Sequence, residues 1–150
     1  MRQQQFEQFV LQIGGLHRSM EKLRRRQAAA LGLNSIHAFW LYLLAVYEEG
    51  LSASELAAAA RIDRSLVSRE IEDLEDMGLI ATREQTAHRR YGWKFVLTPL
   101  GRETADQVSR VSRSLQEAVD RGIPPEDLAV FYRTLEAISR NTEQLINNQK

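Results

Sequence analysis

Residues 52–80 contain two short helical patterns separated by a turn, SASELAAAARIDRSLVSREIEDLEDMGLI. Ser52 and Glu55 have the spacing of a capping box, in which each side chain satisfies a backbone N–H group at a helix start. The alanines that follow favour a helix, and Asp63 offers an N-cap for a second helix that starts at about Arg64. This arrangement predicts a helix-turn-helix.

The second of these helices has an apolar side and a polar side. Its apolar residues recur at three- and four-residue spacing and predict packing on a core: Leu66, Val67, Ile71, Leu74 and Met77. The polar side carries Arg64, Ser65, Ser68 and Arg69. Arginine can donate two hydrogen bonds to guanine, and both arginine and serine side chains can bind phosphates. The pattern therefore favours a recognition helix in the DNA major groove, with an ordinary helical hairpin as the alternative.

Composition is that of a soluble globular protein, since 43% of the 150 residues are hydrophobic and 27% are charged. No stretch approaches the roughly 18 apolar residues of a membrane span, and the N-terminus MRQQQFEQF lacks a signal-peptide core. We therefore expect a cytoplasmic protein with no membrane partner. The chain has no cysteine, which excludes disulfides and thiolate chemistry.

The 20 basic and 20 acidic residues cancel, so bulk charge does not favour nucleic acid. DNA contacts must come from local patches, and two basic patches occur, in residues 61–69 and 83–94. The second patch includes the loop between two predicted strands, residues 81–83 and 92–97, and this loop contains Arg89 and Arg90. A β-hairpin directly after a recognition helix is a wing, whose arginine suits the minor groove.

Three long helices with narrow apolar seams are predicted, over residues 6–31, 100–118 and 128–145. The second of these helices has Thr98 as its predicted N-cap and Pro99 as its first residue. These seams are too long for one small winged core, which predicts an intertwined two-fold dimer.

A further helix, IHAFWLYLLAVYEEG, follows a predicted cap at Ser35 and is apolar nearly all round. The centre of the core is predicted at Phe39, Leu41, Leu43, Leu44 and Val46. A partly wet boundary is predicted for Trp40, Tyr42 and Tyr47, whose aromatic rings have polar tips. Core packing is favoured over a ligand cleft for any single aromatic residue.

The order of these elements resembles the MarR family of winged helix-turn-helix transcriptional regulators over nearly the whole chain. Residues 65–80, SLVSREIEDLEDMGLI, are similar to the family's recognition helix, and LTPLG at 97–101 to its junction between wing and dimerisation helix. The family's wing usually carries Asp-x-Arg, whereas this wing reads AHRRYGWKF, which leaves open whether Arg89 or Arg90 enters the minor groove.

The resemblance implies a homodimer that binds a pseudo-palindromic operator in double-stranded DNA, usually as a repressor that a small aromatic effector releases. It implies a mainly α fold with a small β-hairpin wing, in which residues 35–98 bind DNA while residues 1–34 and 99–150 form a helical dimerisation region. An effector cleft would have His17, His37 and Trp40 as walls. The three histidines are a poor match for the family's zinc-sensing branch, so we expect no metal and no cofactor.

The predicted DNA-contacting residues are Arg64, Ser65, Ser68, Arg69, Arg89 and Arg90. The leading hypothesis is thus a sequence-specific transcriptional regulator. The alternative is a winged-helix dimer that binds a protein partner without recognising DNA, which the zero net charge and the missing wing aspartate favour. An enzyme is the weakest interpretation, because the chain has no Gly-rich phosphate loop and no paired His-Glu motif.

Overall fold

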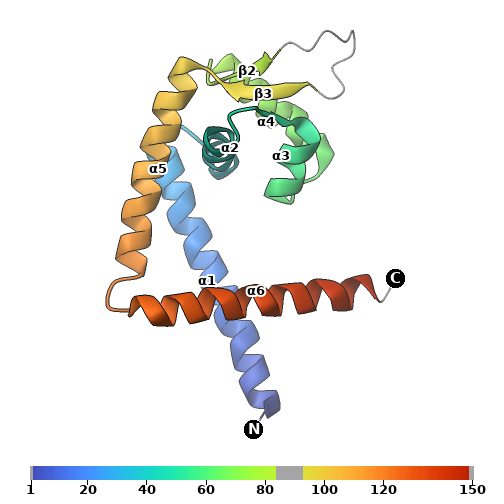
Figure 1. Ribbon diagram of the computed structural model, residues 1–150, viewed down its shortest axis with the longest axis vertical. Coiled ribbons are helices and arrows are strands. Elements are labelled where there is room, and N and C mark those ends of the chain that lie inside the picture. The colour runs from blue at the N-terminus through green and yellow to red at the C-terminus, as the bar shows by residue number, and fades with distance from the viewer. Residues whose placement is uncertain (1, 84–92, 149–150) are drawn as a thin grey trace. The chain divides into compact units, whose positions relative to one another are not determined.

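The computed structural model describes residues 2–83 and 93–148, and it is mostly helical with a small antiparallel sheet (Figure 1). The elements are α1 (Arg2–Ala30), α2 (Ser35–Val46), β1 (Leu51–Ser52), α3 (Ala53–Ala60), α4 (Arg64–Asp76), β2 (Ile80–Arg83), β3 (Lys94–Leu97), α5 (Pro99–Val119) and α6 (Pro125–Asn147). The helices predicted from the sequence are confirmed. The chain divides into two compact units, residues 1–111 and 112–150, with α5 running from the first into the second.

The sheet has the strand order β1-β3-β2, and both pairings are antiparallel. β2 and β3 pair from Ile80 opposite Leu97 to Arg83 opposite Lys94, at the two strands predicted from the sequence. The two-residue strand β1 was not predicted; its Leu51 lies opposite Phe95. β1 immediately precedes α3, so the sheet is joined directly to the helix-turn-helix.

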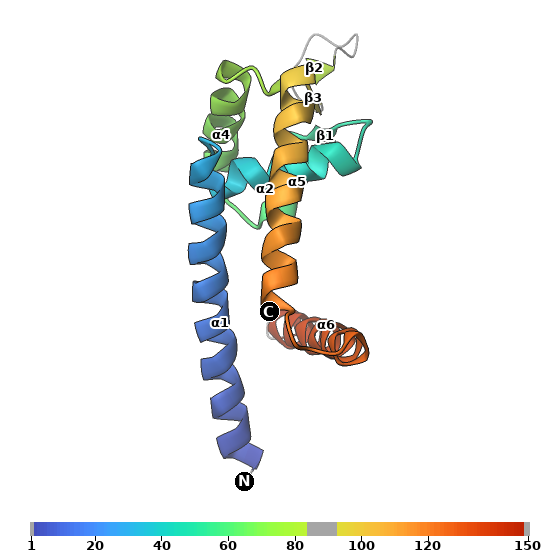
Figure 2. The ribbon, with the colours of Figure 1, turned by 90° about the vertical axis from the view of Figure 1, so that its left-hand side faces the viewer.

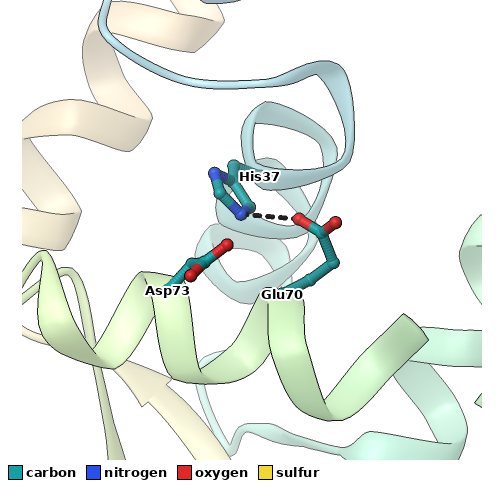
Figure 3. Close-up of side chains that lie close together, drawn as sticks. All are labelled: His37, Glu70 and Asp73. Carbon is teal, nitrogen blue, oxygen red and sulfur yellow. Dashed lines mark ion pairs between the residues drawn. The ribbon is translucent and has the colours of Figure 1, made fainter. Parts of the chain in front are cut away.

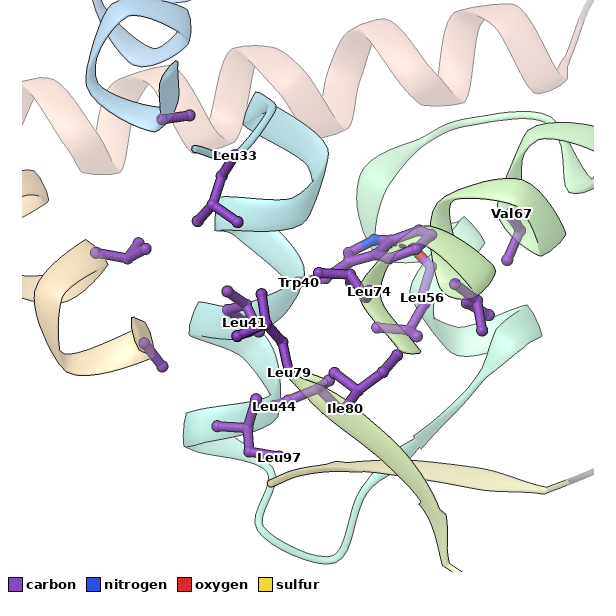
Figure 4. Close-up of a cluster of buried hydrophobic side chains, with 14 residues drawn as sticks. Leu33, Trp40, Leu41, Leu44, Leu56, Val67, Leu74, Leu79, Ile80 and Leu97 are labelled. Carbon is purple, nitrogen blue, oxygen red and sulfur yellow. Dashed lines mark hydrogen bonds between the residues drawn. The ribbon is translucent and has the colours of Figure 1, made fainter. Parts of the chain in front are cut away.

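The core of the first unit is built around α2, which contacts α1, α3, α4 and β3 (Figure 4). Trp40 is fully buried, and its indole N–H donates a 3.1 Å hydrogen bond to the carbonyl oxygen of Leu56 in α3. The predicted boundary position of Trp40 is therefore wrong, because the indole N–H finds its partner inside the protein rather than in water. Val46, predicted in the core, is 56% exposed at the end of α2.

The chain bends by 79° between α1 and α2 (Figure 2). The N-cap of α2 is Asn34, whose side-chain oxygen accepts a 2.8 Å hydrogen bond from the backbone N–H of His37. The predicted cap, Ser35, is instead the first residue of the helix. The two neighbouring residues are both good caps, and the amide of Asn34 makes the bond.

The junction between β3 and α5 is held by Thr98, as predicted. Its hydroxyl accepts a 2.9 Å hydrogen bond from the Gly101 N–H and donates a 2.6 Å bond to the carbonyl oxygen of Gly78, just after α4. Leu100, predicted at the start of the apolar seam, is 52% exposed. Gly101, together with Ala105 and Val108 further along α5, is buried instead.

Large apolar side chains remain exposed on the terminal helices. On α1 they include Phe6, Val10, Leu11 and Leu16. In the second unit no described residue of α6 is buried, and its exposed apolar residues include Val130, Phe131, Ile138, Leu145 and Ile146. Part of each predicted seam is therefore exposed, including Phe6 and Leu16 on α1 and Phe131 and Leu145 on α6.

Candidate nucleic-acid interface

The helix-turn-helix begins with the predicted capping box. The Ser52 hydroxyl accepts a 3.3 Å hydrogen bond from the Glu55 N–H, and the Glu55 carboxylate accepts a 2.7 Å bond from the Ser52 N–H. The bond from the Ser52 N–H, a 2.9 Å bond from the Ser52 hydroxyl and the nearby charge of Lys94 hold the pKa of Glu55 below its ordinary value of 4.5. The start of α3 therefore carries the full capping box that the sequence predicts.

The turn between the two helices contains Arg61, which ends α3 in the left-handed conformation at φ +53°. Asp63 occupies the N-cap position of α4, but its side chain makes no capping hydrogen bond, so the predicted capping bond is wrong. α4 nevertheless starts at Arg64, as predicted. Its position comes from packing, because Val67, Ile71 and Leu74 are all buried in the core of the first unit.

The buried side of α4 is narrower than the sequence predicts. Leu66 is 49% exposed and Met77 is 39% exposed, so these two assignments to the buried side are wrong. Val67, Ile71 and Leu74 already supply the buried stripe at four- and three-residue spacing, which leaves Leu66 beside it rather than in it.

Three predicted DNA-contacting residues lie on one exposed side of α4. Ser65, Ser68 and Arg69 are all exposed, and their three- and four-residue spacing makes them neighbours on the helix surface. Leu66 also lies on this surface. It was not predicted there, because a leucine at helical spacing is typical of a core position. We call Ser65, Leu66, Ser68 and Arg69 the α4 face. The side chain of Arg64 lies outside the described part of the structure.

The predicted wing is described only at its base. Arg89 and Arg90 lie outside the described residues, so their position is not tested. At the base, the guanidinium of Arg83 on β2 forms a 2.8 Å ion pair with the carboxylate of Glu49, in the segment between α2 and β1. Both side chains are largely exposed, so this pair contributes little to stability.

The three residues predicted to line an effector cleft have different surroundings. His17 lies on α1, where it lines an open hollow of about 390 Å³ with Arg18, Glu21, Lys22, Arg25 and Arg26. His37 is buried in α2 and pairs with Glu70 of α4 at 2.8 Å. Trp40 is fully buried in the core. Of the surroundings of His17, His37 and Trp40, only the basic hollow beside His17 is accessible to a ligand.

The chain matches the MarR family model over residues 31–90, which begin at the end of α1 and include the helix-turn-helix. Residues 31–90 of this chain are thus similar to the MarR family. The resemblance inferred from the sequence is thus confirmed over the segment that contains α2, α3 and α4.

Solved structures of MarR family proteins share the fold of nearly the whole chain. A MarR family regulator from Neisseria meningitidis has a TM-score of 0.80 at 20% identity, over 97% of this chain and 99% of that one. A MarR family transcriptional regulator from Listeria monocytogenes complexed with 26-mer DNA has a TM-score of 0.77 at 19% identity, over 88% and 87%. MarR from Staphylococcus aureus in complex with salicylate and kanamycin has a TM-score of 0.79 at 16% identity, over 92% of each chain. This chain therefore has the fold of MarR family transcriptional regulators.

Within the described residues, no single helix is long and apolar enough to cross a membrane. The α1 and α2 segments pass that test of length and composition only when they are joined across their 79° bend. In the MarR fold described above, α2 is the helix around which the core is packed.

Proposed function

We propose that this chain is a sequence-specific DNA-binding transcriptional regulator that acts as a homodimer. The observation that carries the proposal is the α4 face. It presents hydroxyl, guanidinium and apolar groups on the second helix of a helix-turn-helix, which is the helix that enters the major groove in this class of fold. The similarity in fold to the Listeria monocytogenes regulator complexed with DNA supports it.

Each group on the α4 face has a suitable partner on DNA. The Arg69 guanidinium can donate two hydrogen bonds to the O6 and N7 atoms of guanine, and Ser65 and Ser68 can bind base edges or phosphates. Arg64, at the helix start, is assigned to the DNA backbone. Arg89 or Arg90 in the wing is assigned to the minor groove, where positive side chains are attracted to the narrow groove of A-tracts.

The dimer is proposed from the uncovered apolar residues of α1 and α6. Exposed apolar side chains are ordinary when scattered, but a row of them along a helix predicts a partner surface. A two-fold partner uses the same surface on both copies and matches a pseudo-palindromic operator. In this proposal residues 1–34 and 99–150 form the dimer, and residues 35–98 bind DNA.

We also propose that the protein represses transcription and that a small aromatic effector releases it from DNA. Support comes from the Staphylococcus aureus relative, solved with salicylate and kanamycin, and from the hollow beside His17. That hollow carries four arginine and lysine side chains and one glutamate, so it suits an aromatic carboxylate. Titration of salicylate into the DNA complex tests this part: release of DNA supports it, and unchanged affinity contradicts it.

In this proposal the protein binds DNA rather than catalysing a reaction, and it does so in the cytoplasm. The competing role is a winged-helix dimer that binds a protein. Salt dependence separates the two, because displacement of counterions from phosphates makes DNA affinity fall steeply as salt rises.

A genomic-fragment selection with the purified protein at two salt concentrations tests the proposed function. Enrichment of a two-fold symmetric site, with weaker binding at the higher salt, is the expected result. Lack of enrichment at both concentrations contradicts DNA recognition and favours the protein-binding role.

A further inference from the structure

Three side chains that could bind a metal ion meet between α2 and α4: His37, Glu70 and Asp73 (Figure 3). The imidazole of His37 comes from α2, and the two carboxylates come from neighbouring turns of α4. One nitrogen or oxygen atom from each side chain lies within 4.8 Å of the other two. The fold therefore brings together a donor set that no spacing in the sequence indicates.

We propose that His37, Glu70 and Asp73 form a binding site for a divalent transition-metal ion, with Zn²⁺ as the best fit. One imidazole nitrogen and two carboxylate oxygens are donors that zinc accepts at about 2.0–2.2 Å, usually with a fourth ligand in a tetrahedron. Imidazole favours zinc and its neighbours in the first transition row over Mg²⁺ and Ca²⁺, which take oxygen ligands.

Metal binding requires a small rearrangement of the three donor atoms. Donor atoms in a tetrahedral zinc site lie about 3.4 Å apart at these bond lengths. His37 Nε2 and Glu70 Oε2 are 2.8 Å apart and must separate slightly, whereas Asp73 must move inward. Asp73 is exposed, so its side chain is free of tight packing and can turn toward the other two.

Burial and hydrogen bonding prepare the inner half of the site. The side chain of His37 is only 7% exposed, and that of Glu70 is 16% exposed. The Asn34 amide nitrogen donates a 2.8 Å hydrogen bond to Glu70 Oε2 and lies 3.3 Å from His37 Nε2. A hydrogen-bonded carboxylate is typical of metal ligands, because such outer partners hold the ligand in position.

Access comes from the opposite side, where the exposed Asp73 reaches solvent and water can complete the coordination. Zinc would bind the Nε2 lone pair of a neutral imidazole, so any proton between Nε2 and the Glu70 carboxylate is released to solvent. The bound ion would tie α4 to α2 more tightly than one hydrogen bond does. Glu70 directly follows Arg69, so this tie would lie next to the α4 face.

Competition for Zn²⁺ between the purified protein and a chromogenic chelator tests the site. We expect one zinc ion per chain and a rise in melting temperature, because an ion that binds only the folded state stabilises it. Mg²⁺ should compete poorly. Glu70→Gln and Asp73→Asn should each weaken zinc binding by at least the roughly 10- to 100-fold loss that follows removal of an outer-shell partner.

Two control variants make the result specific. Glu72→Gln removes an exposed carboxylate from the same helix and should leave zinc affinity unchanged. His17→Ala removes the histidine that lines the hollow on α1 with Glu21, and it too should leave zinc affinity unchanged. Because Asp73 is exposed, Asp73→Asn should fold even if a change at the partly buried Glu70 does not.

The proposal is overturned by any of three results. These are no zinc binding by the wild-type chain, binding that persists unchanged in Asp73→Asn, and binding that is lost in His17→Ala. In each case the cluster would be a hydrogen-bonded clamp between α2 and α4 without a metal role.

Discussion

The backbone of Gly101 in α5 lies directly against the carbonyl oxygen of Leu79, so that a Cβ atom at position 101 would come within 1.8 Å of that oxygen. Such a contact forces backbone to move, since Leu79 cannot yield as a flexible side chain would. The Leu79 carbonyl also accepts a 3.1 Å hydrogen bond from the Thr98 N–H. The end of α4, the start of β2 and the start of α5 are therefore fitted together through backbone atoms.

Gly101→Ala is expected to lower the free energy of unfolding by about 1–3 kcal/mol, because it overpacks this junction. Urea denaturation measures the change. Glu103→Ala, at an exposed position two residues further along α5, should stay within about 0.5 kcal/mol of the wild type. Equal stability of the Gly101→Ala variant and the wild type would contradict the close approach.

Glu55→Gln tests the charge in the capping box. The pKa of Glu55 is lowered in the folded state, so its carboxylate stabilises the fold above the ordinary value of 4.5. That stabilisation is lost as pH falls through the lowered pKa. The variant should therefore be less stable than the wild type in urea titrations at about pH 7, and the difference should shrink at about pH 3. A difference that is the same at both pH values would refute the assignment.

Leu66→Ala tests the apolar member of the α4 face. Leucine can contact the methyl group of thymine, so the variant should lose preference for a T·A pair at one position of the selected site, by about 1–3 kcal/mol. Binding to a panel of single-base variants of that site measures the preference. Met77→Ala removes another exposed apolar side chain, at the opposite end of α4, and should keep the preference. If Leu66→Ala has the same base preferences as the wild type across this panel, Leu66 does not contact the DNA bases.

Phe131→Glu tests the proposed dimer. Phe131 is 45% exposed and packs edge-on against Tyr132, so its replacement should not unfold the chain. A charge in an apolar interface lacks a partner, and sedimentation should find a larger monomer fraction. Arg133→Glu, outside the apolar seam of α6, should sediment like the wild type. The proposal fails if both variants sediment alike.

Features set by neighbouring residues could be predicted from the sequence. The Ser52–Glu55 capping box and the Thr98 cap each depend on side chains within three residues, and both are present in the structure. The start of α2 was placed one residue late because Asn34 and Ser35 are both suitable caps. Only the bond from the His37 N–H to Asn34 distinguishes them.

Features that depend on tertiary packing could not be predicted in this way. α2 is apolar nearly all round, so its sequence does not reveal that Trp40 faces Leu56 while Val46 faces solvent. β1 is too short to have a pattern of its own and exists because β3 lies beside it. The His37, Glu70 and Asp73 cluster likewise depends on how α2 and α4 pack.

The exposed side of α4 could be predicted only in part from the sequence. Ser65, Ser68 and Arg69 lie together because helical spacing places them on one side. Leu66 was assigned to the core because spacing alone does not distinguish the edge of an apolar stripe from its centre.

The most direct test of the account is the affinity of wild type, Arg69→Ala and Arg110→Ala for the selected DNA site across a range of salt concentrations. The account predicts a steep fall in wild-type affinity with salt and a loss of about 1–3 kcal/mol for Arg69→Ala, with relaxed base preference. Arg110→Ala, which removes an exposed arginine of α5, should bind like the wild type. Wild-type affinity that does not depend on salt, or Arg69→Ala binding equal to that of the wild type, would contradict DNA recognition by the α4 face.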